Sequence, residues 1–241
     1  MQNNLNSHVA AYLGGSVYDF DNKIILNWYP ERVILKSQRT QSLLELGLGH
    51  GLTTEKFSKY FERHVVVEGS SAVIHHFREK FPECSAEIIE NYFETFESSE
   101  LFDVILMGFV LEHVDDPLHI IQRYKRFLTP GGTLFLAVPN AAVLNRRLGH
   151  LAGLLPDLSE LSENDLLLGH KRYYTVQTLT DVIIQAGYRI DELEGIYLKP
   201  LTTRQMISLE LQPAVIQAMC EIGTNYPELS CGILAQISKN E

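Results

Sequence analysis

Short apolar runs alternate with longer amphipathic stretches between residues 42 and 140. Apolar runs bounded by turn residues are typical of buried strands, and the longer mixed stretches are typical of helices. Strands are predicted at 42–47, 64–70, 86–90, 101–110 and 133–140, and helices at 52–61, 71–81 and 117–128. This alternation predicts an α/β fold with a parallel sheet and helices on both of its faces.

The helix at 117–128 has a start that is marked by two residues. Asp116 can cap the first turn with its side chain, and Pro117 suits the first helical position because its nitrogen carries no hydrogen. The Thr-Pro-Gly-Gly sequence at 129–132 predicts a turn before the next strand.

The pattern changes on both sides of this block. Residues 141–174 are rich in leucine and contain several charged residues, so we expect a helical insertion whose apolar face covers a neighbouring surface. Residues 1–40 mix polar and aromatic side chains, including Tyr12 and Trp28, and we expect short helices that pack on the main domain. The remaining predicted elements are a helix at 175–187 that ends at Gly187, a strand at 188–198, a helical stretch at 202–221 and a strand at 231–238.

Composition excludes several classes of protein. The net charge of −10 argues against a broad nucleic-acid surface, and no apolar run approaches the roughly 20 residues of a membrane helix. The first residues lack the basic start and apolar core of a secretory signal. The cysteines are three and far apart, which indicates reduced thiols. We therefore expect a cytoplasmic protein of one domain without nucleic-acid or membrane partners.

The first predicted strand leads into a glycine loop, Gly47-Leu-Gly49-His-Gly51. A strand, a glycine loop and a helix together present backbone N–H groups at the carboxyl end of a sheet, where ligands bind in open α/β folds. A nicotinamide or flavin dinucleotide site would have G-x-G-x-x-G, but Leu52 occupies the third glycine position. The dinucleotide interpretation is therefore disfavoured, although it remains an alternative.

Two acids near the loop indicate a different ligand. Glu45 lies two residues before Gly47, where a pyrophosphate would gain nothing from a negative charge and a ligand with a positive charge would. Glu68 ends the second predicted strand, where an acid can accept hydrogen bonds from both hydroxyls of a ribose. A ribose and an ammonium group without a pyrophosphate suggest S-adenosylmethionine.

At this point the sequence resembles the class I S-adenosylmethionine-dependent methyltransferases, over about residues 41–198. The resemblance is carried by ELGLGHG, VVVEGS, FDVILMGFVLEHVDDP and LTPGGTLFLAVPN, four motifs in the family's order. The last two are similar to those of ubiquinone-biosynthesis O-methyltransferases and of sugar and natural-product methyltransferases. The resemblance implies a Rossmann-like, seven-stranded, mostly parallel sheet with the last strand antiparallel and with a helical insertion.

The resemblance also implies roles for single residues on the cofactor side. It assigns the methionine part of the cofactor to Glu45 and the glycine loop (Gly47, Gly49 and Gly51), the ribose to Glu68, and the methionine ammonium to the end of the fourth strand at Phe109. The family often has a Gly-Asp pair near 91–92 whose acid reaches the adenine amine, but this sequence has no aspartate there, and Glu94 is the acid nearby. Tyr92 or Phe93 is then expected to line the adenine pocket, or else to be part of the core.

The acceptor side has less specific candidates. His113 follows the fourth strand and titrates near neutral pH, so it is the candidate general base, with Glu112 beside it. The alternative is that this pair only braces the loop. The candidates for contact with the acceptor are His170, Arg172 and Tyr173, unless their segment is only a polar loop before the helix at 175–187.

A metal ion is not expected from the local pattern. Some relatives in the ubiquinone pathway are thought to bind a divalent ion through E-x-x-E-H, but Phe109 occupies the position of the first acid. We therefore predict a reaction that needs no divalent metal.

These features predict a methyltransferase that moves a methyl group from S-adenosylmethionine to an oxygen or nitrogen of a small molecule, with a sugar or secondary metabolite favoured. The alternative is a catalytically inactive protein that binds S-adenosylmethionine or a partner. We expect one domain, with a homodimer contact or part of the acceptor pocket at 202–221. Its parts would be a helical cap (1–40), a cofactor-binding core (41–140), a helical lid (141–174) and the C-terminal part of the sheet (175–241).

Overall fold

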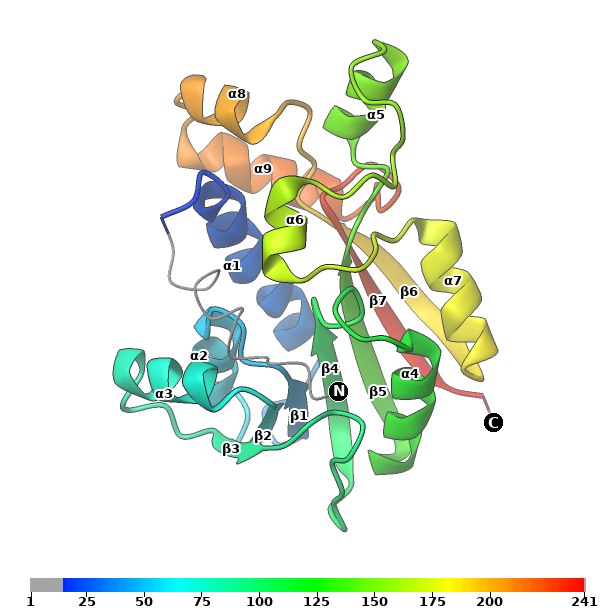
Figure 1. The fold of residues 1–241 in the computed structure, drawn as a ribbon. Helices are drawn as coiled ribbons and strands as arrows, with labels where there is room; N and C mark the ends of the chain where they lie inside the picture. Colours follow the sequence, from blue (N-terminus) through cyan, green and yellow to red (C-terminus); the bar gives the residue numbers. More distant parts are fainter. Residues whose placement is uncertain (1–14, 241) are drawn as a thin grey trace.

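The computed structural model describes residues 15–240, and within this range seven strands form one sheet (Figure 1). The strands are β1 (Ser42–Leu46), β2 (Arg63–Glu68), β3 (Glu87–Glu90), β4 (Phe102–Gly108), β5 (Leu128–Pro139), β6 (Tyr188–Ile196) and β7 (Gly232–Lys239). Their order is β3-β2-β1-β4-β5-β7-β6, and β7 is antiparallel to both of its neighbours. The other pairings are parallel, so the predicted mixed sheet is confirmed.

Helices cover both faces of this sheet (Figure 1). They are α1 (Asp19–Leu35), α2 (Leu52–Ser58), α3 (Ser71–Lys80), α4 (Pro117–Tyr124), α5 (Leu144–Leu151), α6 (Glu163–Leu168), α7 (Val176–Gln185), α8 (Thr203–Ser208) and α9 (Pro213–Gly223), with a 3₁₀ turn at Lys125–Phe127. Side chains of α4 and α7 join one large apolar core, and side chains of α1 and α9 join another across the sheet. The central strands β1 and β4 are consequently buried on both faces, which explains their nearly continuous apolar sequences.

The order in which strands are added to the sheet reverses between β1 and β4. From β1 the chain builds outward through β2 to β3, and it then returns to place β4 and β5 on the other side of β1. The connections on the two sides of this point leave in opposite directions and open a crevice at the carboxyl ends of the strands. The topology therefore places the candidate site where the glycine loop and the residues after β4 meet.

Two local predictions have different outcomes. The start of α4 is confirmed, because the Asp116 carboxylate accepts a hydrogen bond of 2.9 Å from the backbone N–H of His119 and Pro117 is the first residue of the helix. The predicted turn at 129–132 is wrong, because these residues belong to β5. The extra residues form an irregularity in the pairing with β4, where Gly131 has a φ of 78°.

Between residue 15 and β1 the structure has one long helix where several short ones were predicted. α1 has 17 residues, and the part of the prediction that includes Tyr12 lies outside the described residues. Arg32 on α1 donates hydrogen bonds of 2.9 and 2.7 Å to the carboxylate of Glu194 on β6. Tyr29 packs so closely that a Cβ atom on Gly108 would lie 2.5 Å from its hydroxyl oxygen. α1 is therefore fixed directly over the end of β4.

The insertion at 141–174 departs from its prediction in one respect. It contains the expected helices, α5 and α6, but α5 buries none of its residues, and its Leu151 is 84% exposed. α6 likewise exposes Leu166 and Leu167 and buries the acid Asp165. The expectation that the apolar face of the insertion covers a neighbouring surface is wrong for these leucines, whereas Leu168 of α6 is partly buried and lines the cavity of the candidate site. Among the described residues, no helix combines the length and apolar character that crossing a membrane requires.

Candidate active site

A cavity of about 800 Å³ lies at the carboxyl ends of β1, β2 and β4. Its wall is formed by the glycine loop, by α1, by residues 92–95, by the loop after β4 and by parts of the insertion at 141–174. One continuous space therefore joins the predicted cofactor residues to the predicted acceptor residues.

The three loop glycines all have positive φ angles: 81° for Gly47, 48° for Gly49 and 77° for Gly51. Residues with a Cβ atom rarely adopt this conformation, so the backbone path depends on glycine. At Gly51 a Cβ atom would also lie 2.6 Å from the ring of Phe77. All three glycines line the cavity, and their backbone is open to a ligand.

Glu68 at the end of β2 is buried and lines the same cavity. Its carboxylate accepts hydrogen bonds from the backbone N–H of Leu48 (3.0 Å) and of Ser70 (2.7 Å). Burial raises the pKa of Glu68, although these backbone donors oppose the effect. A carboxylate has about four acceptor positions, so Glu68 retains capacity for hydroxyl groups of a ligand.

Glu45 lies behind the cavity wall and not on it. Its carboxylate accepts a hydrogen bond of 3.1 Å from the Thr53 hydroxyl, and its other oxygen lies 2.9 Å from Nε2 of His64. Thr53 lines the cavity, whereas Glu45 does not. The structure therefore gives no support to direct contact between Glu45 and the methionine part, because the Thr53 side chain lies between Glu45 and the cavity.

The aromatic residues of the cofactor side do line the cavity. Tyr92 and Phe93 lie there with Glu94, as expected for the walls of an adenine pocket. Phe109, directly after β4, has a φ of 57°, which is unusual for a residue with a side chain. A backbone hydrogen bond of 2.8 Å to Ala137 and edge-to-face packing on Tyr29 hold it in this conformation. Such strained residues cluster at functional sites.

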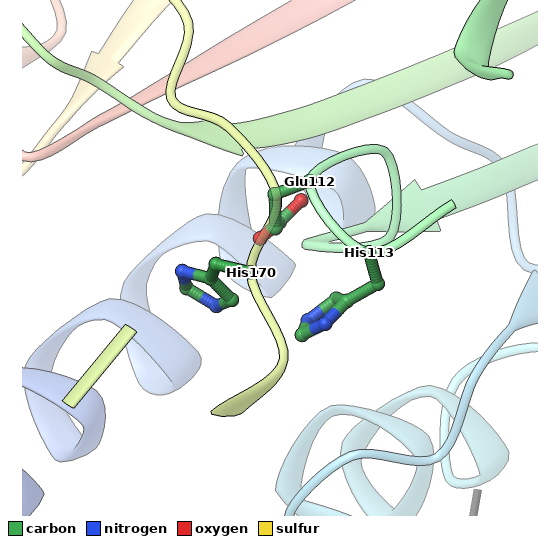
Figure 2. Close-up of side chains that lie close together, drawn as sticks. All are labelled: Glu112, His113 and His170. Atoms are coloured by element: carbon green, nitrogen blue, oxygen red, sulfur yellow. The ribbon is translucent and has the colours of Figure 1, made fainter. Parts of the chain in front are cut away.

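The acceptor candidates Glu112, His113 and His170 lie together (Figure 2). The two imidazole rings are 4.7 Å apart and nearly perpendicular. Glu112 is fully buried, and within the described residues neither of its carboxylate oxygens has a hydrogen-bond partner. Burial raises the pKa of Glu112 to about 7, although the charge of His170 opposes the shift. The fold thus brings His170 next to Glu112 and His113, although His170 lies 57 positions after His113 in the sequence.

Asp165 on α6 positions His170 and was missed in the sequence. Its Oδ1 lies 2.9 Å from Nδ1 of His170, and its other oxygen accepts hydrogen bonds from the hydroxyls of Ser162 and Tyr173. Burial alone would raise the pKa of Asp165, but interactions with His170, Ser162 and Tyr173 outweigh it and hold the pKa well below its usual value. The capping position of Asp165 in α6 gave no sign of this second role.

The two other predicted acceptor residues have different positions. Tyr173 lines the cavity, as expected. Arg172 does not, because its guanidinium donates hydrogen bonds to the backbone carbonyls of Leu111 (3.2 Å), Val114 (2.8 Å) and Asp115 (3.2 Å). The expected contact of Arg172 with the acceptor is therefore not supported, and its observed role is to fasten the loop that carries Glu112 and His113.

A second polar group on the cavity wall had no signal in the sequence. Lys199 donates hydrogen bonds to Asp21 (2.7 Å) and to Thr203 (3.1 Å), and all three residues are buried. The other carboxylate oxygen of Asp21 has no partner within the described residues. These side chains come from α1, from the segment after β6 and from α8, so only the tertiary fold brings them together.

Fold, cavity and motif order together define a class I S-adenosylmethionine-dependent methyltransferase. Residues 26–193 match the family described as a methyltransferase domain, and the chain belongs to this family. The cofactor of the class is S-adenosylmethionine, which sets the dinucleotide alternative aside.

Curated relatives bear the name ubiquinone biosynthesis O-methyltransferase. The Pseudomonas fluorescens protein is 26% identical over 207 residues, which cover 79% of this chain and 81% of that protein. The Parvibaculum lavamentivorans protein is 31% identical over 116 residues, which cover 46% of this chain and 43% of the relative. The mitochondrial protein of Rattus norvegicus is 25% identical over 177 residues, which cover 66% of this chain. That alignment spans 48% of the rat protein, so the last two matches each cover less than half of the relative.

Solved structures share the fold across nearly the whole chain. The N-methyltransferase NodS from Bradyrhizobium japonicum WM9, in complex with S-adenosylhomocysteine, has a TM-score of 0.64 at 16% identity and covers 99% of this chain and 100% of its own. A methyltransferase from Mesorhizobium loti has a TM-score of 0.61 at 16% identity and covers 88% of this chain and 97% of its own. At these identities the similarity establishes the fold alone.

Proposed function

We propose that this protein transfers a methyl group from S-adenosylmethionine to an oxygen or nitrogen atom of a small molecule. The observation that carries the proposal is the single cavity that joins the glycine loop and Glu68 to Glu112, His113 and His170. Relatives with O-methyltransferase names and a structural neighbour with an N-methyltransferase name leave both acceptor atoms open.

The residues of the cofactor half fit S-adenosylmethionine. Glu68 would accept hydrogen bonds from the ribose hydroxyls, and the open backbone of Gly47 and Gly49 would lie against the methionine part. Tyr92 and Phe93 would flank the adenine. When bound, this cofactor supplies an electrophilic methyl group on a sulfonium sulfur.

The acceptor half would handle the proton that the acceptor loses. A nucleophilic oxygen or nitrogen attacks the methyl carbon in line with the departing sulfur, and its proton must pass to a base. His113 is the proposed base, because it lies on the cavity beside His170. The insertion would cover this end, since Asn145, Asp165 and Leu168 within it line the cavity, and water would be excluded from the reacting charges.

The polar side chains of Asp21, Lys199 and Thr203 on the cavity wall favour a polar acceptor, such as a sugar or a hydroxylated secondary metabolite. Asp21 offers a buried carboxylate oxygen that no described residue contacts, and Lys199 and Thr203 offer further polar atoms beside it. A hydroxyl or amine of the acceptor could satisfy the Asp21 oxygen, whose burial without a partner is otherwise unfavourable.

A transfer assay tests this proposal. Cofactor with a labelled methyl group would be incubated with a panel of phenols, sugar nucleotides and amines, and both labelled product and S-adenosylhomocysteine would be measured. We expect turnover with a polar acceptor. Binding of S-adenosylhomocysteine without turnover of any acceptor would favour the inactive cofactor-binding protein instead.

A further inference from the structure

We infer that Glu112, His113 and His170 form a binding site for a divalent transition-metal ion at the acceptor end of the cavity. One ligand atom from each of these residues lies within 4.8 Å of the others. An ion bound about 2.0–2.2 Å from imidazole nitrogens and carboxylate oxygens requires such a spacing. Figure 2 shows that the three side chains approach one another from two separate segments of the chain.

The environment of Glu112 provides independent support. Its side chain is 0% exposed, and within residues 15–240 no other residue makes a hydrogen bond to either of its carboxylate oxygens. Carboxylates in protein interiors are normally paired or coordinate metal ions, because burial of an unpaired charge is strongly unfavourable. A cation bound between Glu112 and the two imidazoles would satisfy this group, whereas no described side chain does.

His170 is oriented as a metal ligand. Asp165 lies 2.9 Å from its Nδ1, and although this contact lacks the geometry of a hydrogen bond, the carboxylate charge favours a proton on Nδ1 and leaves Nε2 as the nitrogen available to an ion. Histidines that bind metals commonly make this contact with a carboxylate through their second nitrogen. The Ser162 and Tyr173 hydroxyls hold Asp165 in turn, so the ring of His170 is fixed from behind.

The ligand types indicate which ions the site would take. Two imidazoles and one carboxylate suit Zn²⁺, Co²⁺, Fe²⁺ or Mn²⁺, whereas Mg²⁺ and Ca²⁺ prefer sites composed of oxygen atoms. Three protein ligands leave at least one coordination position, and all three residues line the cavity. An acceptor hydroxyl could occupy that position, where the ion would lower its pKa. With the ion bound, His113 would be a ligand, so the role of base that is proposed for it applies to the protein without the ion.

This inference revises the prediction of a reaction that needs no metal. That prediction depended on Phe109, which replaces the first acid of the local E-x-x-E-H pattern. The fold places His170 beside Glu112 and His113, so a third ligand comes from a distant segment that the pattern does not include. The role in methyl transfer rests on the proposed function, but binding of the ion does not.

The test uses Co²⁺ and Zn²⁺ with the full-length protein after treatment with EDTA. Titration with Co²⁺ is followed by visible absorption, and titration with Zn²⁺ by calorimetry. We expect one ion per chain, with affinity at least tenfold lower in Glu112→Gln and in His170→Ala. Asp165→Asn should lower the affinity by about 10- to 100-fold, as expected when the carboxylate partner of a ligand is lost.

His75→Ala is the matched control, because His75 is exposed on α3 and pairs with Glu79 as a surface His–acid pair. It should bind the ion as the wild type does. Equal affinity in wild type, Glu112→Gln and His170→Ala would overturn the inference, as would the absence of a stoichiometric ion in wild type.

Binding of S-adenosylhomocysteine is measured on every variant as a check of folding. A protein that binds S-adenosylhomocysteine but no ion would refute the metal site and leave the proposed function intact. A protein that binds the ion at these residues but no S-adenosylhomocysteine would refute the proposed function and leave the metal site intact.

Discussion

The two halves of the cavity are built in different ways. The cofactor half comes from short segments that directly follow β1 and β2, and its central contacts are made by backbone groups and by Glu68. The acceptor half comes from side chains far apart in the chain, such as Glu112 with His170 and Asp21 with Lys199. Local glycines specify the first half, whereas the second exists only when the insertion and α1 are in place.

The largest expected effect concerns the insertion. Deletion of residues 145–165 would remove Asp165 and with it the support of His170, so we expect methyl transfer to be abolished while S-adenosylhomocysteine still binds. Turnover and calorimetry on the same preparation measure the two properties. A control with Leu151→Ser and Leu154→Ser should keep full activity, because both side chains are more than 80% exposed. Full turnover after the deletion would show that the insertion is not a lid.

The next largest effect concerns removal of the proton that the acceptor loses. His113→Ala should lower kcat by about 100-fold or more if His113 is the base or holds the ion at the acceptor. The affinity for S-adenosylhomocysteine should not change, since Glu68 and the glycine loop remain. A variant as active as wild type would remove His113 from the mechanism.

A smaller effect distinguishes Glu68 from Glu45 by the affinity for S-adenosylhomocysteine. Glu68→Ala should weaken S-adenosylhomocysteine binding by about 1–3 kcal/mol, because it removes charge-assisted hydrogen bonds to two hydroxyls. Glu45→Gln should weaken it less, because Glu45 lies behind Thr53. Calorimetry compares the two, and a larger loss in Glu45→Gln would contradict the geometry.

The smallest expected effect is a loss of folding stability at acid pH. Burial alone would raise the pKa of Glu194, but Arg32 and Lys36 outweigh it and lower the pKa, so the Glu194 carboxylate helps to hold α1. A lowered pKa means that this stability is present above the unfolded pKa of about 4.3 and is lost as pH falls through the folded value. Trp28 is the single tryptophan and lies on α1. Its fluorescence during denaturation should show less acid sensitivity in Glu194→Gln than in wild type.

The same contrast explains what the sequence could predict. The strands were predicted within two residues at each end, except the start of β5. For the central strands the reason is that strands buried on both faces are continuous apolar runs. The start of β5 was missed because Gly131 predicts a turn, whereas the sheet accommodates it as an irregularity in the pairing. Sequence patterns were therefore sufficient to predict elements whose structure depends on residues close to them in the sequence.

The candidate site was predictable only in part. Glu68, the three glycines and His113 were found from their positions after strands, and they line the cavity. Glu45 and Arg172 were predicted to contact ligands. In the structure Glu45 instead contacts Thr53 and His64, and Arg172 donates hydrogen bonds to backbone carbonyls. Leucine content likewise could not show that α5 would bury none of its residues. These outcomes depend on tertiary contacts that no spacing in the sequence encodes.

The most direct test of the division into two halves is calorimetry with S-adenosylhomocysteine and with NAD, on wild type and on Glu112→Gln. The account predicts that both proteins bind S-adenosylhomocysteine with the same affinity and that neither binds NAD. Tight NAD binding without an S-adenosylhomocysteine signal would contradict the assignment of the cofactor half. Loss of S-adenosylhomocysteine binding in a folded Glu112→Gln protein would show that the two halves are not separate.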